Sequence, residues 1–320
     1  MSASESLTVC VEKIDKLNDD TITLTLTAAN GAQLPPYSAG AHVSVFIDDG
    51  LIREYSLCGD PADAETYQLG ILKDADSRGG SAAMHERIRI GDKIQISSPK
   101  NQFQLDESAR YSVLIGGGIG ITPILAMAYE LHRNAQEFDL FYCVTQAEKA
   151  AFLPVLEQAP FADRVTLHVD QIEPTNPLKP NSDFPPAATG AHIYVCGPSG
   201  FMDWCFDEAK ALGYGADRLH KEDFRADVDL TGGGFTVEAR GSGVTVQVAE
   251  GQRIVEALTA AGIEIEVSCE EGVCGTCLCD VLEGEPDHRD SFLTDEERDS
   301  SELIMVCCSR SKSSKLVLDV

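Results

Sequence analysis

The sequence predicts a multidomain protein that combines one all-β part with two parts of mixed α/β structure. Three observations support this fold class. Short alternating runs fill the first third of the chain, strand-like and helix-like segments alternate in the middle, and six of the eleven cysteines lie in the last fifth. A length of 320 residues suits two or three domains of about 100–150 residues. We expect an antiparallel β-barrel over residues 1–105, a parallel α/β domain over 106–225, a linker over 226–234 and a smaller α/β domain over 235–320.

The first hundred residues have the pattern of half-buried strands. Thr21–Thr27 reads T-I-T-L-T-L-T, and similar short runs follow at Val43–Ile47, Tyr67–Leu72 and Lys93–Ile96. Gly, Pro and Asp residues separate the runs. Many short β-branched segments with period two favour a small antiparallel barrel.

The middle of the chain alternates between strand-like and helix-like segments. The strand-like runs are Ser112–Ile115, Leu140–Val144, Val165–Val169 and His192–Cys196. Helical spacing follows Thr122, covers Ala147–Leu156 and extends from Ser199 to Leu212. We expect Thr122 to cap the first helix and Pro123 to open it. This alternation predicts a parallel sheet with helices on its faces.

The last segment predicts a compact domain after an acidic and then glycine-rich linker. Its expected elements are a hairpin of Phe235–Ala239 and Val244–Val248 around Gly241-Ser242-Gly243, a helix from Ile254 to near Gly262, and a strand at Leu278–Leu282. Between the helix and the last strand lies a loop rich in cysteine.

This loop has the spacing of ligands for a [2Fe–2S] cluster. Cys269, Cys274 and Cys277 form a C-x4-C-x2-C pattern, and Cys307 follows after 29 further residues. Four thiolates in this arrangement are the plant-type ligand set, in which one loop supplies three ligands and a distant segment supplies the fourth. Structural zinc is an alternative, although zinc sites more often use two C-x2-C pairs. Buried cysteines without a metal are the other alternative.

Two details refine the expected cluster loop. Gly272 and Gly275 allow the backbone to turn tightly and to direct N–H groups at the sulfurs. The adjacent pair Cys307-Cys308 offers two thiols where one is needed. We choose Cys307 as the ligand and treat Cys308 and Cys279 as its neighbours.

Glycine-rich turns follow two of the predicted parallel strands. Gly116–Gly120 joins the first strand to its helix, and Cys196-Gly197-Pro198 joins the last strand to its helix. Such turns let a pyrophosphate approach backbone N–H groups at a helix N-terminus. A glycine turn can also serve packing alone, so the first loop by itself is a weak signal.

Two motifs in the barrel segment are compatible with a flavin site. Arg53-Glu54-Tyr55-Ser56-Leu57 lies at a strand position, and Arg78-Gly79-Gly80-Ser81 precedes a short helical stretch. Arginine suits phosphate by charge and geometry, glycines followed by serine provide anion-binding N–H groups, and tyrosine offers a flat face to a ring. Taken alone, each motif could equally be a surface arginine or a turn.

Together, R-x-Y-S-L, G-G-G-I-G-I-T-P and C-G-P resemble the ferredoxin–NADP reductase superfamily over residues 5–225. The C-terminal domain resembles plant-type ferredoxins, which implies a β-grasp fold and a one-electron carrier. The whole-chain order, with R-G-G-S and M-V-C-C-S-R, resembles the class IA reductases of Rieske-type oxygenases, of the phthalate dioxygenase and vanillate O-demethylase reductase type.

The resemblance implies roles for particular residues. The residues expected to contact the flavin are Arg53, Tyr55, Ser56 and Leu57. Those expected to bind the flavin phosphate are Arg78, Gly79, Gly80 and Ser81. The residues expected to line the dinucleotide groove are Gly116, Gly118, Gly120 and Thr122. Those expected near the nicotinamide are Cys196, Gly197 and Pro198. Ser56 and Phe224 take the positions at the hydride-transfer site, with Phe224 closing the nicotinamide domain beside the flavin. An ordinary core aromatic is the alternative for Phe224.

The implied cofactors are FMN, NADH and the [2Fe–2S] cluster, and the implied partner is a Rieske-type terminal oxygenase acting on an aromatic ring or as an O-demethylase. NADH is preferred over NADPH because Val144–Lys149 contains an acid, one lysine and no arginine to hold a 2′-phosphate. Two alternatives remain open. One is an electron-transfer subunit of another flavoenzyme system, such as a dihydroorotate dehydrogenase, and the other is a non-enzymatic iron–sulfur redox sensor.

The overall charge of −27 disfavours nucleic acid and anionic membrane surfaces as partners. No apolar run reaches the ~18–20 residues that span a bilayer, and the opening MSASESLTVC lacks the features of a signal peptide. We therefore expect a cytoplasmic protein.

Overall fold

The computed structural model describes residues 6–48, 51–74, 80–171, 175–224, 229–267 and 269–320. The chain divides into two compact units, Met1–Phe224 and Arg225–Val320, and each is described by itself. Among the described residues, no helix is long and apolar enough to cross a membrane.

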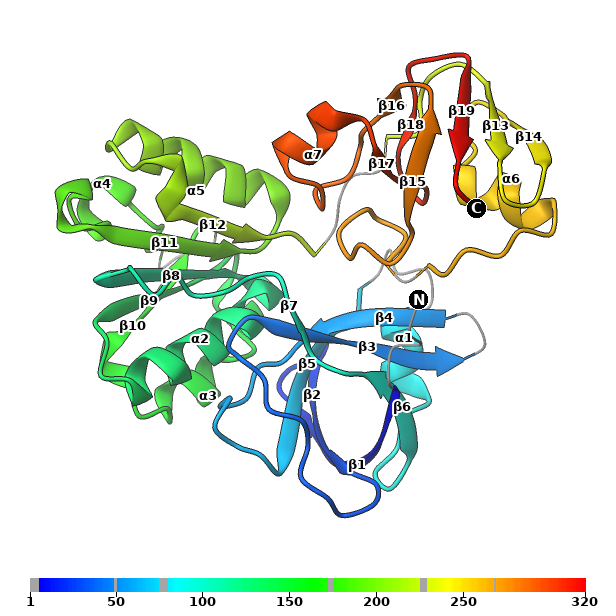
Figure 1. Ribbon diagram of the computed structural model, residues 1–320. Helices are drawn as coiled ribbons and strands as arrows, with labels where there is room; N and C mark the ends of the chain where they lie inside the picture. Colours follow the sequence, from blue (N-terminus) through cyan, green and yellow to red (C-terminus); the bar gives the residue numbers. More distant parts are fainter. Residues whose placement is uncertain (1–5, 49–50, 75–79, 172–174, 225–228, 268) are drawn as a thin grey trace. The chain divides into compact units, whose positions relative to one another are not determined.

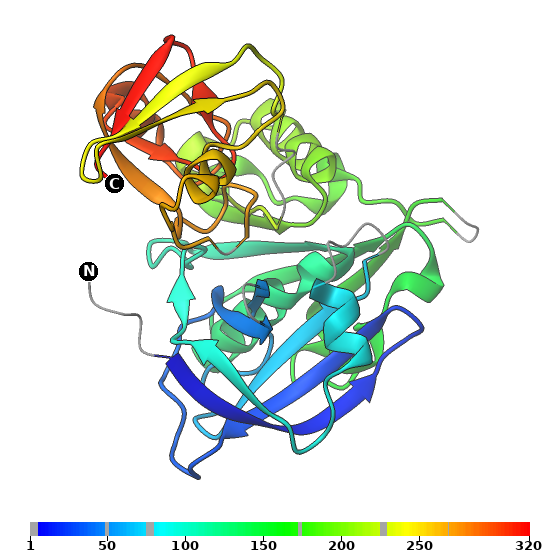
Figure 2. The same ribbon diagram turned by 90° about the vertical axis from the view of Figure 1, so that its right-hand side faces the viewer.

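The N-terminal part of the first unit is an antiparallel sheet rolled into a barrel. Its strands run in the order β4-β3-β6-β1-β2-β5, with β7 paired to β3. The elements are β1 (Ser6–Lys16), β2 (Thr21–Ala28), β3 (Ala41–Asp48), β4 (Leu51–Ser56), β5 (Thr66–Leu72), α1 (Gly80–Glu86), β6 (Lys93–Ser97) and β7 (Lys100–Asn101). The strands predicted from alternation are all present, and Figure 2 shows the strong curvature of the dark-blue strands.

The barrel closes around the alternating side chains that predicted it. An antiparallel bridge joins Leu57, just beyond β4, to Leu69 on β5. The inward-facing residues Leu24, Leu26, Leu69 and Ile71 are fully buried. Burial of each such side chain contributes about 1.5–3 kcal/mol, so the period-two pattern fixes which face of each strand points inward.

The rest of the first unit is a parallel sheet with the strand order β10-β9-β8-β11-β12. The elements are β8 (Tyr111–Gly117), α2 (Ile121–Arg133), β9 (Phe138–Val144), α3 (Leu153–Glu157), β10 (Val165–Val169), α4 (Pro180–Asp183), β11 (Ala191–Cys196), α5 (Ser199–Ala211) and β12 (Leu219–Glu222). Figure 1 shows α2 and α5 on opposite faces of this sheet. The strand order reverses between β8 and β11, where open α/β sheets bind ligands at the carboxyl ends of their strands.

Two local expectations in this sheet need correction. Thr122 does not cap α2, because the helix begins at Ile121 and its N-cap residue is Gly120. A 3-10 turn over Gly118–Gly120 runs directly into the helix, and the Thr122 hydroxyl donates a hydrogen bond to the Ile119 carbonyl at 3.0 Å. The helix expected over Ala147–Leu156 is divided into a 3-10 turn at Ala147–Lys149 and the short α3, because Pro154 fits only the first turn of a helix.

The second unit is a mixed sheet in the order β14-β13-β19-β15-β17, with a separate β16-β18 pair. Its elements are β13 (Phe235–Ala239), β14 (Val244–Val248), α6 (Ile254–Ala260), β15 (Leu278–Glu283), β16 (Pro286–Asp287), α7 (Asp295–Ser300), β17 (Leu303–Met305), β18 (Arg310–Ser311) and β19 (Lys315–Leu318). The apolar face of α6 packs on this sheet through Ile254 and Leu258. The predicted hairpin, helix and strand are all present.

A buried arginine joins the end of the linker region to the second unit. Arg310 is only 2 % exposed, and its guanidinium donates hydrogen bonds to the carbonyl oxygens of Gln252, Gly232, Gly233 and Ala249 at 2.8–3.5 Å. It also lies over the ring of Phe235. One planar cation therefore satisfies four backbone acceptors.

The substitution Arg310→Met is expected to lower the free energy of unfolding of the second unit by about 2–4 kcal/mol, because it leaves these buried acceptors without donors. Urea unfolding of the full chain, followed by visible absorption of its chromophores, measures the loss. Arg240→Met is the matched control: Arg240 forms exposed ion pairs with Glu238 and Glu283, so we expect a change below about 1 kcal/mol. Equal effects of the two substitutions would contradict this account of Arg310.

Candidate functional site

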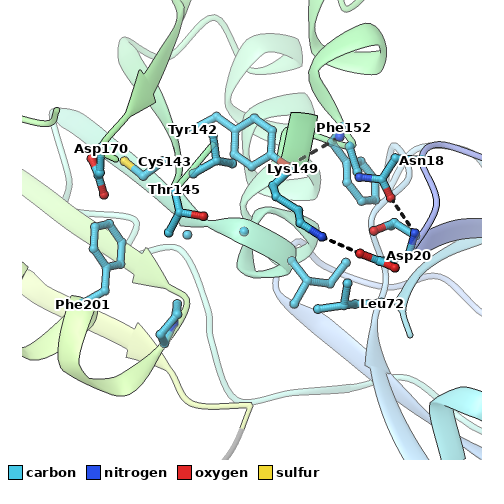
Figure 3. A pocket seen from close by; sticks show the side chains of 17 residues that line it. Asn18, Asp20, Leu72, Tyr142, Cys143, Thr145, Lys149, Phe152, Asp170 and Phe201 are labelled. Atoms are coloured by element: carbon cyan, nitrogen blue, oxygen red, sulfur yellow. Dashed lines mark hydrogen bonds and ion pairs between the residues drawn. The ribbon is translucent and has the colours of Figure 1, made fainter. Parts of the chain in front are cut away.

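The carboxyl ends of the parallel strands open into a cavity of about 380 Å³. Of the residues predicted to bind nucleotide, Gly118 and Pro198 line it, together with Gly117 and Phe201. The side chains of Tyr142, Cys143 and Thr145 come from the end of β9 (Figure 3). The cavity therefore lies where the reversal of strand order places a ligand site in open α/β sheets.

The two glycine turns pack against each other at this edge. A side chain on Gly120 would lie 2.2 Å from the Cys196 carbonyl oxygen, and one on Gly197 would lie 3.0 Å from Gly117 Cα. The backbones of the two loops are thus in direct contact, which only residues without a Cβ permit. Gly118 has φ +57° and faces open space. The sequence singled out both loops, and the structure brings them together.

Charged groups line the cavity at two separate places (Figure 3). Lys149 is the one lysine noted in the sequence after β9, and its ammonium forms an ion pair with Asp20 of the barrel at 2.5 Å. Asp170, just beyond β10, lines the same cavity, and Figure 3 shows it near Cys143 and Phe201. The ammonium of Lys149 is therefore paired within the protein, while the exposed carboxylate of Asp170 lines the cavity.

Ser56 faces a carboxyl group that the sequence did not single out. Glu222, at the end of β12, accepts a hydrogen bond from the Ser56 hydroxyl at 3.3 Å. Burial, together with the nearby carboxylates of Glu54 and Asp223, raises the pKa of Glu222 to about 8. The group is therefore largely protonated at neutral pH. Strand β12 was not predicted from the sequence. The one signal that could have indicated Glu222 is its position two residues before Phe224.

The barrel motifs meet at the start of α1. A Cβ on Gly80 would lie 2.6 Å from Arg53 Cγ and Nε, so the arginine side chain lies flat against the glycine backbone. The Ser81 hydroxyl accepts a hydrogen bond from the backbone N–H of Asp74 at 3.1 Å. Arg78 and Gly79 lie outside the described residues. The structure thus brings together Arg53 with Gly80, two residues of the separate flavin motifs.

The remaining predicted residues of the first unit are spread between site and core. Tyr55 packs partly against the barrel core, and Leu57 is fully buried within it. Gly116 in β8, Thr122 in α2 and Cys196 at the end of β11 are buried. Phe224 is half-buried, packs against the core cluster shared with α2, and is two residues from Glu222.

In the second unit the four predicted cysteine ligands converge. Cys269, Cys274, Cys277 and Cys307 are all buried, and none of the eleven cysteines, all within the described residues, forms a disulfide. The Cys269 thiol makes hydrogen bonds with the thiols of Cys274 and Cys307, and Cys277 makes one with Cys307. The hydrogen bond with Cys307 and burial raise the pKa of Cys277, because a second thiolate so close disfavours its ionisation without a cation.

The loop around these thiols is shaped for sulfur ligands. Gly272 and Gly275 both have φ +76°, and a Cβ on Gly275 would lie 2.3 Å from the ring of Phe292. The backbone N–H of Glu271 donates to Cys269 Sγ at 3.3 Å. Four buried soft donors with N–H groups directed at sulfur fit a [2Fe–2S] cluster well.

The two flanking thiols form hydrogen bonds with backbone carbonyls. Cys308 Sγ donates to the Met305 carbonyl at 3.8 Å, and Cys279 Sγ donates to the Cys277 carbonyl at 3.7 Å. Both are buried within the core of the unit. Their contacts are those of packed, unliganded thiols.

Comparison with known proteins agrees with this geometry. Residues 237–312 match the family described as 2Fe-2S iron-sulfur cluster binding domain. The chain is 46 % identical to the vanillate O-demethylase oxidoreductase of Pseudomonas sp. (strain HR199 / DSM 7063), with 98 % of this chain and 99 % of the relative covered. It is 38 % identical to the carnitine monooxygenase reductase subunit of Escherichia coli (strain K12), with both chains covered in full.

A solved structure shares the whole architecture. Phthalate dioxygenase reductase, described as a modular structure for electron transfer from pyridine nucleotides to [2Fe-2S], matches with a TM-score of 0.74 and 34 % identity over 98 % of both chains. The chain belongs to the class IA oxygenase reductase family. It is an oxidoreductase that serves as the reductase component of an oxygenase system, and its C-terminal unit is the [2Fe–2S] domain.

Membership in the oxygenase reductase family confirms the family and fold predicted from the sequence. The relatives are reductase components that align along their entire length. This argues against a subunit of a dihydroorotate dehydrogenase and against a redox sensor without reductase activity.

Proposed function

We propose that this reductase oxidises NADH and passes the two electrons singly, through FMN and the [2Fe–2S] cluster, to a Rieske-type terminal oxygenase. The observation that carries the proposal is the presence, in one chain, of a strand-edge cavity lined by residues of two packed glycine turns and of four converging buried thiols. We assign residues 1–105 to FMN, 106–225 to NADH and 235–320 to the cluster, with 226–234 as the linker. The protein acts in the cytoplasm.

The barrel supplies the flavin site. Arg53, with Gly80 against its side chain, offers a guanidinium and a backbone free of Cβ to the flavin phosphate, and Arg78, Gly79 and Ser81 complete that loop. Tyr55, Ser56 and Leu57 follow along the same strand end. When bound, the flavin accepts a hydride from the nicotinamide and gives up its electrons one at a time, which no side chain can do.

The residues of the parallel sheet position the nicotinamide nucleotide. Gly116, Gly118 and Gly120 allow the pyrophosphate to approach the backbone, with Thr122 held beneath them in α2. We assign Cys196, Gly197 and Pro198 to the nicotinamide end of the groove, and Phe224 to the position that covers it. Ser56 donates a hydrogen bond to Glu222, and this pair would hold a proton near the site of hydride transfer.

We assign Cys269, Cys274, Cys277 and Cys307 as the cluster ligands. The thiol contacts favour Cys307 over Cys308, whose sulfur is directed at a backbone carbonyl. Since the cluster itself provides the one-electron step, the residues around it need only fix its position and exclude water.

Asp170 is the residue we hold responsible for nucleotide choice. An exposed carboxylate in the groove can accept hydrogen bonds from the ribose hydroxyls of NADH and repels the 2′-phosphate of NADPH. Lys149 cannot offset that repulsion while Asp20 pairs with it.

We expect Asp170→Asn to lower kcat/KM for NADH by about tenfold, the value of a lost charge-assisted hydrogen bond, and to raise kcat/KM for NADPH. Steady-state rates with both nucleotides measure the shift, with the exposed Asp163→Asn as control. An unchanged NADH/NADPH ratio would refute this role for Asp170.

The raised pKa of Glu222 makes the stability of the protein depend on pH. Between the ordinary carboxyl value near 4.5 and about 8, the folded chain holds a proton that the unfolded chain has released. This group therefore makes the protein less stable as the pH rises through that window, by up to about 1.4 kcal/mol per pH unit. Glu222→Gln removes the ionisable group, so its stability relative to the wild type should rise from pH 5 to pH 8. Urea unfolding at both pH values checks this, with Glu157→Gln, on the exposed surface, as control. A difference between Glu222→Gln and the wild type that does not vary with pH would contradict the assignment.

The proposed function is tested by purifying the protein and identifying its flavin by mass. Anaerobic addition of NADH and, separately, NADPH should then bleach the flavin and the cluster in turn. We expect FMN, and faster reduction by NADH. FAD in the purified protein, or no reduction by either nucleotide, would contradict the proposal. The relatives act with different oxygenases, and substrate choice belongs to that partner rather than to this chain.

A further inference from the structure

A second group of ligand-type side chains lies in the first unit, away from the cavity. Asp106, in the segment that leads into β8, faces His192 at the start of β11 and His220 in β12. One donor atom from each of the three lies within 4.8 Å of the other two. His192 Nδ1 is 2.9 Å from His220 Nε2 and 3.9 Å from Asp106 Oδ2. Three segments far apart in sequence thus direct nitrogen and oxygen donors at one point.

We propose that Asp106, His192 and His220 form a binding site for a divalent transition-metal ion such as Zn²⁺. Two imidazoles and one carboxylate are the ligand types that zinc, cobalt and nickel prefer, whereas magnesium and calcium prefer oxygen alone. Asp106 and His220 are partly exposed while His192 is buried, so solvent reaches the site.

The surrounding contacts hold the donors in place before any metal binds. Asp106 accepts hydrogen bonds from the backbone N–H and the hydroxyl of Ser108, at 2.7 and 2.5 Å, and its own N–H donates to the Tyr194 hydroxyl at 2.8 Å. The His220 ring stacks on Tyr194 with centroids 4.6 Å apart and on His192 with centroids 5.2 Å apart. Metal ligands oriented by such neighbours bind more tightly than mobile ones.

The protonation states at neutral pH also suit a metal. Burial and the neighbouring His192 lower the pKa of His220, so its ring is neutral and can donate a lone pair. The two hydrogen bonds from Ser108 lower the pKa of Asp106, which therefore stays ionised. Metal binding requires this combination of neutral imidazole and charged carboxylate.

A metal in this position would bind the short edge strand β12 to its neighbour. Among the described residues β12 pairs with β11 alone, through Leu219–Glu222, and it ends at Glu222, two residues before Phe224. A bound ion would link this strand to β11 and to the segment before β8. Because a ligand stabilises the state that binds it, the thermal midpoint of the first unit should rise with Zn²⁺ concentration.

Equilibrium dialysis of the full chain, with its flavin and cluster, against ZnCl₂ tests the site. Zinc and iron are then counted in the same sample, so that intact cluster iron excludes zinc bound at the cysteines. We expect one zinc ion per chain in the wild type and in the control His132→Ala, which removes an exposed histidine of α2. His220→Asn and Asp106→Asn are expected to weaken zinc binding by at least about tenfold.

His192→Ala should abolish zinc binding, and the two variants at partly exposed positions keep the test valid if this buried substitution disturbs folding. Zinc binding that is unchanged in both His220→Asn and Asp106→Asn, or no zinc bound by the wild type while its iron is intact, would overturn the proposal. Reduction by NADH is measured on the same samples, so failure of the zinc site is distinguishable from failure of the proposed reductase function.

Discussion

Replacing Cys307 with alanine is expected to abolish electron delivery to the oxygenase while leaving flavin reduction by NADH intact. Its thiol contacts both Cys269 and Cys277, so its loss leaves the cluster with three of its four ligands. Loss of a residue that merely supports a metal ligand lowers metal affinity or activity by about 10–100-fold, and loss of the ligand itself should lower it at least as much. Iron content and the rate of cytochrome c reduction by NADH measure the effect.

The adjacent residue provides the control. Cys308→Ala removes an equally buried thiol whose sulfur contacts the Met305 carbonyl instead. That variant should keep its iron and its rate of cytochrome c reduction within about a factor of a few, with only a small loss of stability from the missing sulfur. If Cys308→Ala loses iron and Cys307→Ala retains it, the fourth ligand is Cys308 and the assignment is wrong.

Gly120→Ala is expected to impair the nucleotide site more than any other single methyl group added to the first unit. The new Cβ would lie 2.2 Å from the Cys196 carbonyl oxygen and 2.6 Å from the Gly197 nitrogen, and backbone atoms cannot move aside as a flexible side chain can. Relief requires the start of α2 to separate from the end of β11. Overpacking of this kind costs about 1–3 kcal/mol or more.

The expected result is a lower thermal midpoint and an affinity for NADH reduced by at least about tenfold, since the two glycine turns no longer meet. Gly200→Ala, in α5, adds the same methyl group where nothing lies within 4 Å, and should be neutral or slightly stabilising. Equal NADH affinity in the two variants would show that the contact between the loops is unimportant for binding.

Most of the fold could be predicted because local pattern and tertiary environment agree. The run T-I-T-L-T-L-T buries alternate side chains in the barrel, and β10, β13 and β14 have the bounds that alternation predicted. The short strands β16 and β18 carry no such pattern, since each has two residues and forms only by pairing across the fold. Thr122 was misplaced because the 3-10 turn before α2 left no role for a side-chain cap.

The candidate site was predictable where its chemistry needs a fixed spacing along the chain. The cysteine loop and both glycine turns are of this kind, and the structure brings their members together. Glu222 and Asp170 were missed because each reaches its site from a strand end far from the motif it joins. The Ser56–Glu222 contact spans 166 positions, and a distance of this kind in sequence gives no local signal.

The central claim is that iron held by Cys269, Cys274, Cys277 and Cys307 receives electrons from NADH through the flavin. Its most direct test is to measure iron, acid-labile sulfide and zinc in anaerobically purified protein, and then to record the electron paramagnetic resonance spectrum after adding NADH. We predict two irons and two sulfides per chain, with the rhombic signal of a reduced [2Fe–2S] centre appearing on addition of NADH. Zinc at the cysteines in place of iron, or an iron centre that NADH leaves oxidised, would contradict it.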